Sequence, residues 1–280
     1  GLGDVYKRQV TGGVPKYIEL FSESSDIYRA IQKCVLNRSG YLYDEPHFLL
    51  QQEVSEVGSY FSIIKAIAAG NHRLSTIAAV LEAKSTNLTK YLKTLMDLDI
   101  LERRVPVTEE NPEKSKRGLY KIKDNYLRFW FAFIYPNMSF IESGHSGIVM
   151  DKIRKGLTTS HIGFVYEDIC QERMWELNVN NAWPFQFSKL GGYWDAKNEI
   201  DIAALDPEGK NLILGECKYW KEPVGLNVLH ALETKACDVA WERDRRKVWY
   251  VLFSISGFSD ELRNHAATRD DLLLIDDGER

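Results

Sequence analysis

Closely spaced cysteines, long apolar runs and a phosphate-binding loop are all missing from this 280-residue chain. Its four cysteines are scattered and none forms a C-x-x-C pair, which argues against a zinc site or a disulfide framework and indicates a reducing compartment. The longest apolar stretch, residues 129–135, stops at Pro136 and is far too short to span a bilayer. We therefore expect a cytoplasmic protein with no membrane segment.

The chain contains no Gly-x-x-x-x-Gly-Lys-Ser/Thr sequence, the motif whose backbone and lysine hold nucleotide phosphates. We therefore do not expect ATP hydrolysis by this chain. An initiator methionine is also lacking, and residues 1–9 connect to nothing recognisable downstream. Because this segment has no apolar stretch, it is unlike a signal peptide. We interpret it as a non-native leader and the remainder as the tail of a longer protein.

The composition is that of a soluble globular protein, with 44% hydrophobic and 27% charged residues. Its length allows one large domain or two ordinary ones. The net charge of −4 gives the whole chain no general attraction to nucleic acid. Residues 58–123, however, carry twelve basic and seven acidic side chains. This local excess of positive charge is suited to contacting phosphates.

Residues 198–206 and 211–220 are predicted to form a β-hairpin. Both segments alternate in hydrophobicity or are apolar, and Pro207, Glu208, Gly209 and Lys210 between them are typical of a turn. A two-residue or a four-residue turn places residue 205 opposite residue 212. A three-residue turn would shift the pairing by one and require a bulge to restore it.

The first of these registers brings acidic side chains together. Asp201 then faces Glu216 and Glu199 faces Lys218, with Cβ atoms about 5 Å apart. An apolar strand face that ends in clustered acids is unfavourable without a partner, because desolvated like charges repel, and a divalent cation would offset the repulsion. The alternative is that these are solvated hairpin charges, with Glu216 and Lys218 forming a surface ion pair of little energetic consequence.

Two helices flank this hairpin in the sequence and carry further polar candidates. Glu167 lies in a predicted helix over residues 163–177, on the same stripe as Cys170 and Met174, so its carboxylate points with the apolar face and needs a cation. Alternatively it reaches water or is stabilised by the helix N-terminus. His230 and Lys235, on a helix predicted over residues 226–240, face either a substrate or solvent.

Residues 58–123 have the layout of a winged helix-turn-helix. Helices are predicted over residues 60–69, 75–81 and from residue 85 or 86 onward, and two alternating strands at 99–105 and 118–122 surround a charged loop, the wing. In such modules the third helix enters the major groove of DNA. That helix would present Lys84, Thr86, Asn87, Lys90 and Lys93. The alternatives are a solvated basic face or a surface that docks on another protein domain.

The last part of the chain is predicted to be a mixed α/β domain that begins after a Gly/Ser-rich linker at residues 143–147. Apart from the hairpin and the two helices already described, we expect strands near residues 184–188, at 247–254 and at 272–275, and a helix at 259–267. Helices interspersed with strands imply a sheet covered on both faces.

Several longer segments carry a resemblance to a known family: residues 12–17, 127–131 with 135–137, 199–202, 215–220, and 253–254 with 257–258. From about Val10 to its end, the chain resembles the C-terminal part of prokaryotic AAA-type ATPases common in archaea. The tail of those proteins is a winged helix followed by a PD-(D/E)XK nuclease-superfamily domain of unknown function. The resemblance implies a remnant of the ATPase helical lid at 10–57, a winged helix domain with an aromatic connector at 58–139 and a restriction-endonuclease-like domain at 140–280.

The same resemblance assigns roles to individual residues. Asp201 and Glu216 would bind the metal, Mg²⁺ or Mn²⁺, with the Cys217 carbonyl as a third ligand, and oxygen ligands suit such ions. Lys218 would orient the attacking water or balance developing charge, and Glu167 would complete the site.

The implied function is Mg²⁺-dependent hydrolysis of a DNA phosphodiester, with DNA and the upstream ATPase domain as partners. Because many members of this superfamily are catalytically silent, the alternative is a non-catalytic DNA-binding or protein-binding module that regulates the ATPase.

Overall fold

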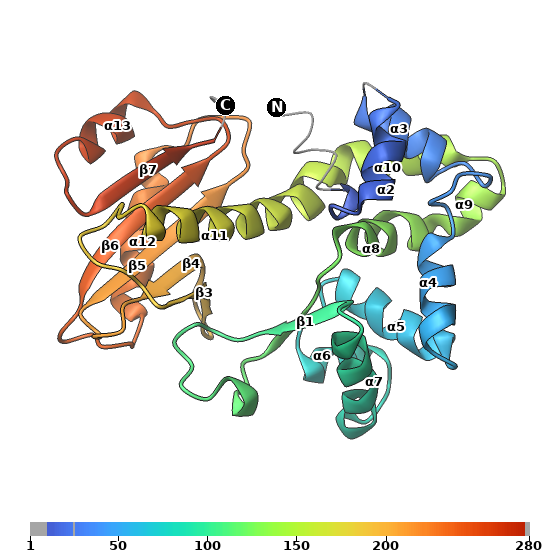
Figure 1. Ribbon diagram of the computed structural model, residues 1–280, viewed down its shortest axis with the longest axis horizontal. Coiled ribbons are helices and arrows are strands. Elements are labelled where there is room, and N and C mark those ends of the chain that lie inside the picture. Colours follow the sequence, from blue (N-terminus) through green and yellow to red (C-terminus); the bar gives the residue numbers. More distant parts are fainter. Residues whose placement is uncertain (1–9, 25, 278–280) are drawn as a thin grey trace. The chain divides into compact units, whose positions relative to one another are not determined.

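The computed structural model describes residues 10–24 and 26–277 and divides the chain into two compact units (Figure 1). Unit 1 comprises the residues up to Arg104 together with Gly118–His161, and unit 2 comprises Val105–Arg117 together with the residues from Ile162 onward. The predicted leader at 1–9 lies outside the described residues. Within the described part of the chain, no helix has both the length and the apolarity needed to cross a membrane.

Unit 1 is largely helical. Its helices and strands are α2 (Pro15–Ser22), α3 (Ile27–Cys34), α4 (Glu45–Glu53), α5 (Val57–Ala68), α6 (Leu74–Val80), α7 (Ser85–Asp97), β1 (Leu101–Arg104), β2 (Leu119–Ile122), α8 (Asn125–Phe129), α9 (Met138–Glu142) and α10 (Ser146–Leu157). Strands β1 and β2 pair antiparallel, with Leu101 opposite Ile122. Elements α5 to β2 therefore occupy the residues for which the sequence predicts a three-helix module with a hairpin.

The boundary between the units differs from the predicted one after residue 139. Helix α10 belongs to unit 1, where Ser146 accepts a hydrogen bond from Gln32 at 3.2 Å and the guanidinium of Arg154 lies 4.4 Å from the ring centroid of Tyr28. The segment expected to be a domain linker is instead a tight turn between α9 and α10, with Gly144 at φ +82°. Residues 10–57 likewise share this unit, since Trp130 donates to the Tyr43 carbonyl at 2.8 Å.

The loop between β1 and β2, predicted to be a wing, belongs to unit 2 by its contacts. The backbone N–H of Val107 donates to the Gly192 carbonyl at 3.0 Å, and the indole N–H of Trp194 donates to the Arg117 carbonyl at 2.9 Å. Arg117 also pairs with Glu109 within the loop. The loop is thus held against strand β3 (Lys189–Trp194).

Unit 2 is built on a five-stranded mixed sheet in the order β3-β4-β5-β6-β7. Strands β3, β4 (Glu199–Leu205) and β5 (Asn211–Lys218) pair antiparallel, and β5, β6 (Lys247–Ser254) and β7 (Leu272–Asp276) pair parallel. The α-helices of this unit among the described residues are α11 (Gly163–Val179), α12 (Leu226–Asp238) and α13 (Asp260–Ala266). The predicted mixed α/β sheet is confirmed.

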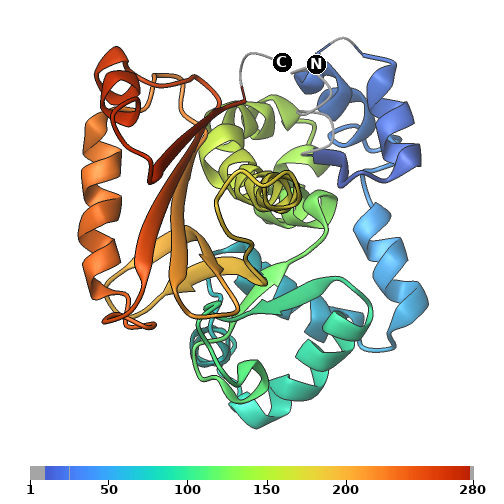
Figure 2. The same cartoon turned by 60° about the vertical axis from the view of Figure 1, so that its left-hand side comes forward.

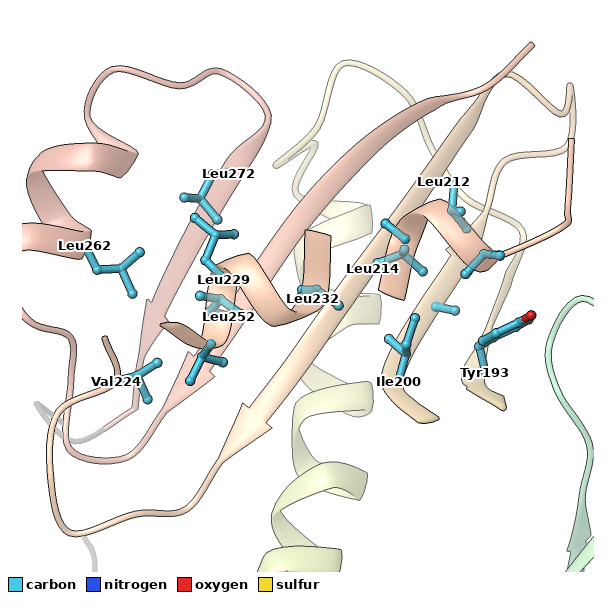
Figure 3. Close-up of a cluster of buried hydrophobic side chains, with 14 of the residues drawn as sticks. Tyr193, Ile200, Leu212, Leu214, Val224, Leu229, Leu232, Leu252, Leu262 and Leu272 are labelled. Carbon is cyan, nitrogen blue, oxygen red and sulfur yellow. The ribbon is translucent and has the colours of Figure 1, made fainter. Parts of the chain in front are cut away.

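Helices α11 and α12 cover opposite faces of this sheet (Figure 2). Alternation along β5 directs Leu212 and Leu214 toward α12, where they pack with Leu229 and Leu232 (Figure 3). Ile213 and Cys217 point the other way and pack with side chains of α11. The face of β5 on which a residue lies therefore decides which helix can reach it.

The hairpin has the first of the two predicted registers. Leu205 lies opposite Leu212, and the N–H of Asp206 donates to the Asn211 carbonyl, so the turn has four residues, 207–210. Gly209 lies at φ +72°, a conformation that favours glycine, and the Asp206 carboxylate accepts from the N–H of Lys210 at 2.9 Å. The four-residue turn thus gives the register in which residue 205 lies opposite residue 212.

The strand predicted near residues 184–188 is wrong, because β3 begins only at Lys189. The side chain of Asn178, at the end of α11, accepts a hydrogen bond from the N–H of Phe187 and donates one to its carbonyl, both at 3.0 Å. The backbone groups that a strand would use at Phe187 are therefore already satisfied by a side chain.

Candidate functional site

The candidate site lies where the ladder between β4 and β5 ends. The paired residues run from Leu205 with Leu212 to Ile202 with Gly215. Beyond that point the carboxylate of Asp201 replaces the backbone, and its Oδ2 accepts a hydrogen bond from the N–H of Cys217 at 2.8 Å. A side chain-to-backbone bond therefore holds Asp201 beside the Glu216-Cys217-Lys218 segment.

A β-bulge in β4 accompanies this change. The pairing of β3 with β4 shifts between Gly191, opposite Ala203, and Tyr193, opposite Ile200, so three steps on β4 face two on β3. The extra residue lies in the stretch that contains Asp201. Bulges bend a strand and redirect a side chain, and they are frequent beside active sites. A regular strand was expected here.

Gly215 allows the strands to approach closely just before Glu216. A Cβ at this position would lie 2.6 Å from Cγ1 of Val251 and 2.8 Å from the Val251 carbonyl oxygen, both on β6. Real Cβ atoms essentially never come so close to other heavy atoms. The glycine therefore fixes where β5 presents Glu216 and Lys218.

Two lysines surround the Glu216 carboxylate, whose side chain is only 6% exposed. Lys218 Nζ pairs with Oε2 of Glu216 and lies 3.6 Å from Oδ2 of Asp201. Lys235 Nζ, from α12, lies 2.6 Å from Oε1 of Glu216 and donates to the Glu199 carbonyl at 2.7 Å. The predicted facing of Glu199 and Lys218 is not part of the ladder, which ends at Ile202. Two carboxylates and two ammonium groups thus form one cluster.

The two carboxylates of this cluster differ in acidity. Burial and the neighbouring charge of Glu216 raise the pKa of Asp201 to about 6, even though Lys218 and the Cys217 N–H act against the rise. Burial would also raise the pKa of Glu216, but Lys218 and Lys235 outweigh it and hold that pKa below its ordinary value. Burial lowers the pKa of Lys218, and the two carboxylates more than compensate, so this pKa is raised.

These shifts predict a pH dependence of stability that comes from Asp201. Because its pKa is higher in the folded chain (about 6) than the ordinary value of 3.8, the folded state binds more protons between about pH 4 and 6, and the free energy of unfolding falls as pH rises through that window. The full loss is roughly 2–3 kcal/mol. Urea denaturation of the wild type and of Asp201→Asn at pH 4.5, 5.5 and 7.0 checks this, since the variant should lack the decline. A difference between the two proteins that stays constant with pH would contradict it.

Cys217 presents its backbone, rather than its side chain, to the cluster. Its thiol is buried with Cys170 on the α11 side of the sheet, and burial raises the pKa of both thiols. Since the N–H and C=O of one strand residue are directed to the same side, the Cys217 carbonyl is directed, like its N–H, toward Asp201. The Cys217 carbonyl oxygen therefore lies on the same side of β5 as the Asp201 carboxylate.

Glu167 is not brought to the cluster as a third carboxylate. It lies on α11, across the sheet from the side chains of Glu216 and Lys218. The pKa of the Cys217 thiol is raised mainly by burial, and the charge of Glu167 contributes to the rise. Gln171, one turn along, donates to the Asp201 carbonyl at 3.3 Å. Among the described residues, no three His, Cys, Asp or Glu side chains are grouped so that they could hold a metal ion. The helical stripe was predicted, but not the sheet face that it covers.

Lys235, for which both a substrate-facing and a solvent-facing position were open from the sequence, contacts Glu216. On α12, Leu232 follows Val228 by four residues and Lys235 follows Leu232 by three, so all three lie on the stripe that packs on the sheet. This helical spacing is the sequence pattern from which the position of Lys235 could have been predicted. His230, its companion in that prediction, is exposed.

The predicted DNA-contacting residues all lie on or beside α7 in unit 1. Leu88, Leu92 and Leu95 face the core of that unit. The polar candidates occupy the remaining surface, where all of them are exposed: Lys84, Thr86, Asn87, Lys90 and Lys93. The helix thus has one buried face and one basic face.

Comparison with known proteins gives a family match, a relative and a distant structural neighbour. Residues 130–236 match a family described as "Archaea bacterial proteins of unknown function" (DUF234). An uncharacterized protein of Methanocaldococcus jannaschii is 38% identical over 210 residues, which is 75% of this chain and 46% of that protein. The chain thus spans about half the length of that relative. A crystal structure of a repair endonuclease from Pyrococcus abyssi aligns with 37% of this chain and 44% of its own, at a TM-score of 0.25 and 12% identity.

Proposed function

We propose that unit 2 carries a metal-dependent nuclease site of the PD-(D/E)XK type that hydrolyses DNA phosphodiesters. The observation that carries the proposal is the position of the Lys218 ammonium, which pairs with Glu216 and lies 3.6 Å from Asp201, at the end of two adjacent strands. Two acids placed this close in a buried position contribute little to the stability of a hairpin, because their mutual repulsion has to be neutralised.

The donor atoms of the cluster fit Mg²⁺ or Mn²⁺. Asp201 and Glu216 offer carboxylate oxygens and Cys217 a carbonyl oxygen, and Mg²⁺ is commonly held by one or two carboxylates with water completing its shell. With a pKa of about 6, Asp201 is largely ionised at pH 7, as a metal ligand must be. A bound ion would supply an activated water and stabilise charge on the phosphate.

The residues of the chain itself position these groups. The Cys217 N–H fixes one oxygen of Asp201, and Lys218 contacts both acids, so its ammonium is available to a water or a phosphate oxygen beside them. Lys235, anchored on the Glu199 carbonyl, restrains the other oxygen of Glu216 and acts as a positioning residue.

A cleavage assay on the full chain tests this function. Supercoiled plasmid and single-stranded DNA are incubated with Mg²⁺, with Mn²⁺ and with a chelator. We expect nicked or shortened products only when a divalent ion is present, because the metal supplies the activated water. The absence of products under every condition, or products that persist in the chelator, would refute the proposal.

We further propose that α7 contacts the DNA backbone, which is the alternative function if unit 2 does not cut. This proposal is supported by the exposure of the basic face that holds Lys90 and Lys93 opposite the buried leucines. Replacing both lysines with alanine should weaken DNA binding and make it less sensitive to salt, since removing one phosphate-binding lysine reduces the slope of log K against log salt by about 1. Anisotropy titrations at several salt concentrations measure this, and an unchanged slope would argue against a role for α7 in binding DNA.

The longer protein of which this chain would be the tail is a separate part of the proposal. Because the Methanocaldococcus jannaschii relative is about twice as long as the matched region, there is room for a further domain, and we propose an ATPase domain upstream as the intramolecular partner.

A further inference from the structure

Trp220 is an exposed aromatic side chain immediately beside the proposed site. It follows Lys218 by two residues, it is 47% exposed, and the Lys218 ammonium lies 5.9 Å from its ring centroid. The other large apolar side chains of unit 2 that the structure shows as exposed, Phe164, Trp175 and Val179, all lie on α11. An indole exposed to water here leaves a large apolar surface without a partner.

The backbone that carries Trp220 is held in place at both ends of its segment. Its carbonyl accepts a hydrogen bond from the Ser256 hydroxyl at 2.6 Å, and the Lys218 carbonyl accepts from the N–H of Ile255 at 3.3 Å. A few residues later, Val224 donates to the Gly257 carbonyl at 2.9 Å. The ring is therefore presented from a fixed segment that begins at the end of β5, and Lys221 next to it is also exposed.

We infer that Trp220 is a stacking platform for an unpaired nucleobase next to the scissile phosphate, so that the preferred substrate is single-stranded DNA or DNA with an unpaired end. This inference rests on the proposed function. A nucleotide joins a flat apolar base to an anionic phosphate, and here an exposed indole lies next to an ammonium group that contacts both candidate metal ligands.

The state of the base follows from the geometry of stacking. Inside a duplex both faces of each base are covered by its neighbours, so an indole can stack only on a base that is unpaired or turned out of the helix, or on the outer face of a terminal pair. Stacking on aromatic side chains is tolerant of sequence, because every base has a flat face. The site should therefore favour unpaired DNA without strong sequence preference.

Binding of fluorescein-labelled oligonucleotides tests the inference. Anisotropy titrations without metal compare a single strand with the blunt duplex of the same sequence, for the wild type, Trp220→Ala and Trp220→Phe. Trp220→Ala should weaken single-strand binding about tenfold and duplex binding less than twofold, and Trp220→Phe should retain most of the affinity, since stacking needs only an aromatic face.

Trp175→Ala is the matched control, because Trp175 is 45% exposed and lies on α11. It should leave both affinities unchanged. The inference would be overturned if Trp220→Ala bound the single strand as well as the wild type does, or if it lost single-strand and duplex binding equally. It would also be overturned if the wild type bound no single strand. If the wild type cleaves DNA and Trp220→Ala binds DNA as the wild type does, only this inference is refuted. If binding depends on Trp220 but the wild type does not cleave DNA, only the nuclease proposal is refuted.

Discussion

Replacing Asp201 with asparagine is expected to reduce metal-dependent cleavage about a thousandfold and, at pH 7, to stabilise unit 2. Cleavage falls because the amide is a neutral and weaker metal ligand, and losing preorganised electrostatic stabilisation at an active site reduces rates by about 10²–10³. Stability rises because burial and the neighbouring charge of Glu216 disfavour the ionised carboxylate of Asp201, as its pKa of about 6 indicates, and the neutral amide avoids both effects. The amide oxygen can still accept from the Cys217 N–H. Product formation and urea denaturation on the same preparation measure both effects.

Asp206→Asn is the matched control for this prediction. Asp206 is a buried aspartate at the other end of the same hairpin, where its carboxylate accepts from the Lys210 N–H and, at 2.7 Å, from the Asn211 side chain. Its replacement should cost about 1 kcal/mol of stability and leave cleavage unchanged, because hydrogen bonds are weakened far from the site. If Asp201→Asn also lost stability, or if it kept cleavage, Asp201 would be a structural residue and the site would have to be abandoned.

The two replacements are expected to change stability in opposite directions, because the two buried carboxylates have different surroundings. In the turn, a carboxylate is surrounded by donors that it satisfies. At the end of the ladder, a carboxylate is placed beside another acid, and two lysines are needed to balance the pair. Perturbed pKa values of this kind cluster at functional sites.

The hairpin was predictable from the sequence because its determinants are local. The turn residues 207–210 and the alternation of the flanking segments limit the pairing to two registers, and the structure has the one in which Leu205 faces Leu212. The closeness of Asp201 and Glu216 followed from that register. The bulge in β4 did not follow from it, because the bulge depends on how β3 pairs with β4. The hydrogen bond from the Cys217 N–H to the Asp201 carboxylate did not follow from it either.

Glu167 and Lys235 show where sequence periodicity is insufficient. Each lies on a predictable helical stripe, but periodicity does not state which face of the sheet a helix will cover. Helix α11 packs against the face that carries Cys217, and α12 packs against the face that carries Leu212 and Leu214. The cation on α12 therefore reaches Glu216, and the predicted acid on α11 does not join the two carboxylates.

The compact units differ from the predicted domain limits for a related reason. A Gly/Ser-rich segment at residues 143–147 is as typical of a tight interhelical turn as of a linker, and only the contacts of α10 with α3 distinguish the two. In the same way, the charged loop 105–117 reads as a solvent-exposed wing until β3 provides partners for it. Long-range packing decided both cases.

Lys218→Met is the second variant with a large expected effect, and it should separate catalysis from metal binding. Cleavage should fall at least a hundredfold, because the ammonium that would stabilise developing charge is gone. The metal-free protein should also lose stability, since removing one partner of a buried ion pair costs about 3–5 kcal/mol and Glu216 keeps only Lys235. Mn²⁺ binding should persist, because both carboxylates remain.

The informative measurement is the shift of the melting temperature on adding Mn²⁺, recorded for Lys218→Met, the wild type and Lys210→Met. Lys210 is a matched lysine on the hairpin turn, where its exposed side chain pairs with exposed Glu208. A divalent cation can take over the neutralising role of Lys218, so the shift should be larger in Lys218→Met than in the wild type, and Lys210→Met should match the wild type. A shift in Lys218→Met no larger than that of the wild type would mean that the cation does not enter between Asp201 and Glu216, and the proposed metal site would then be wrong even if DNA binding were intact.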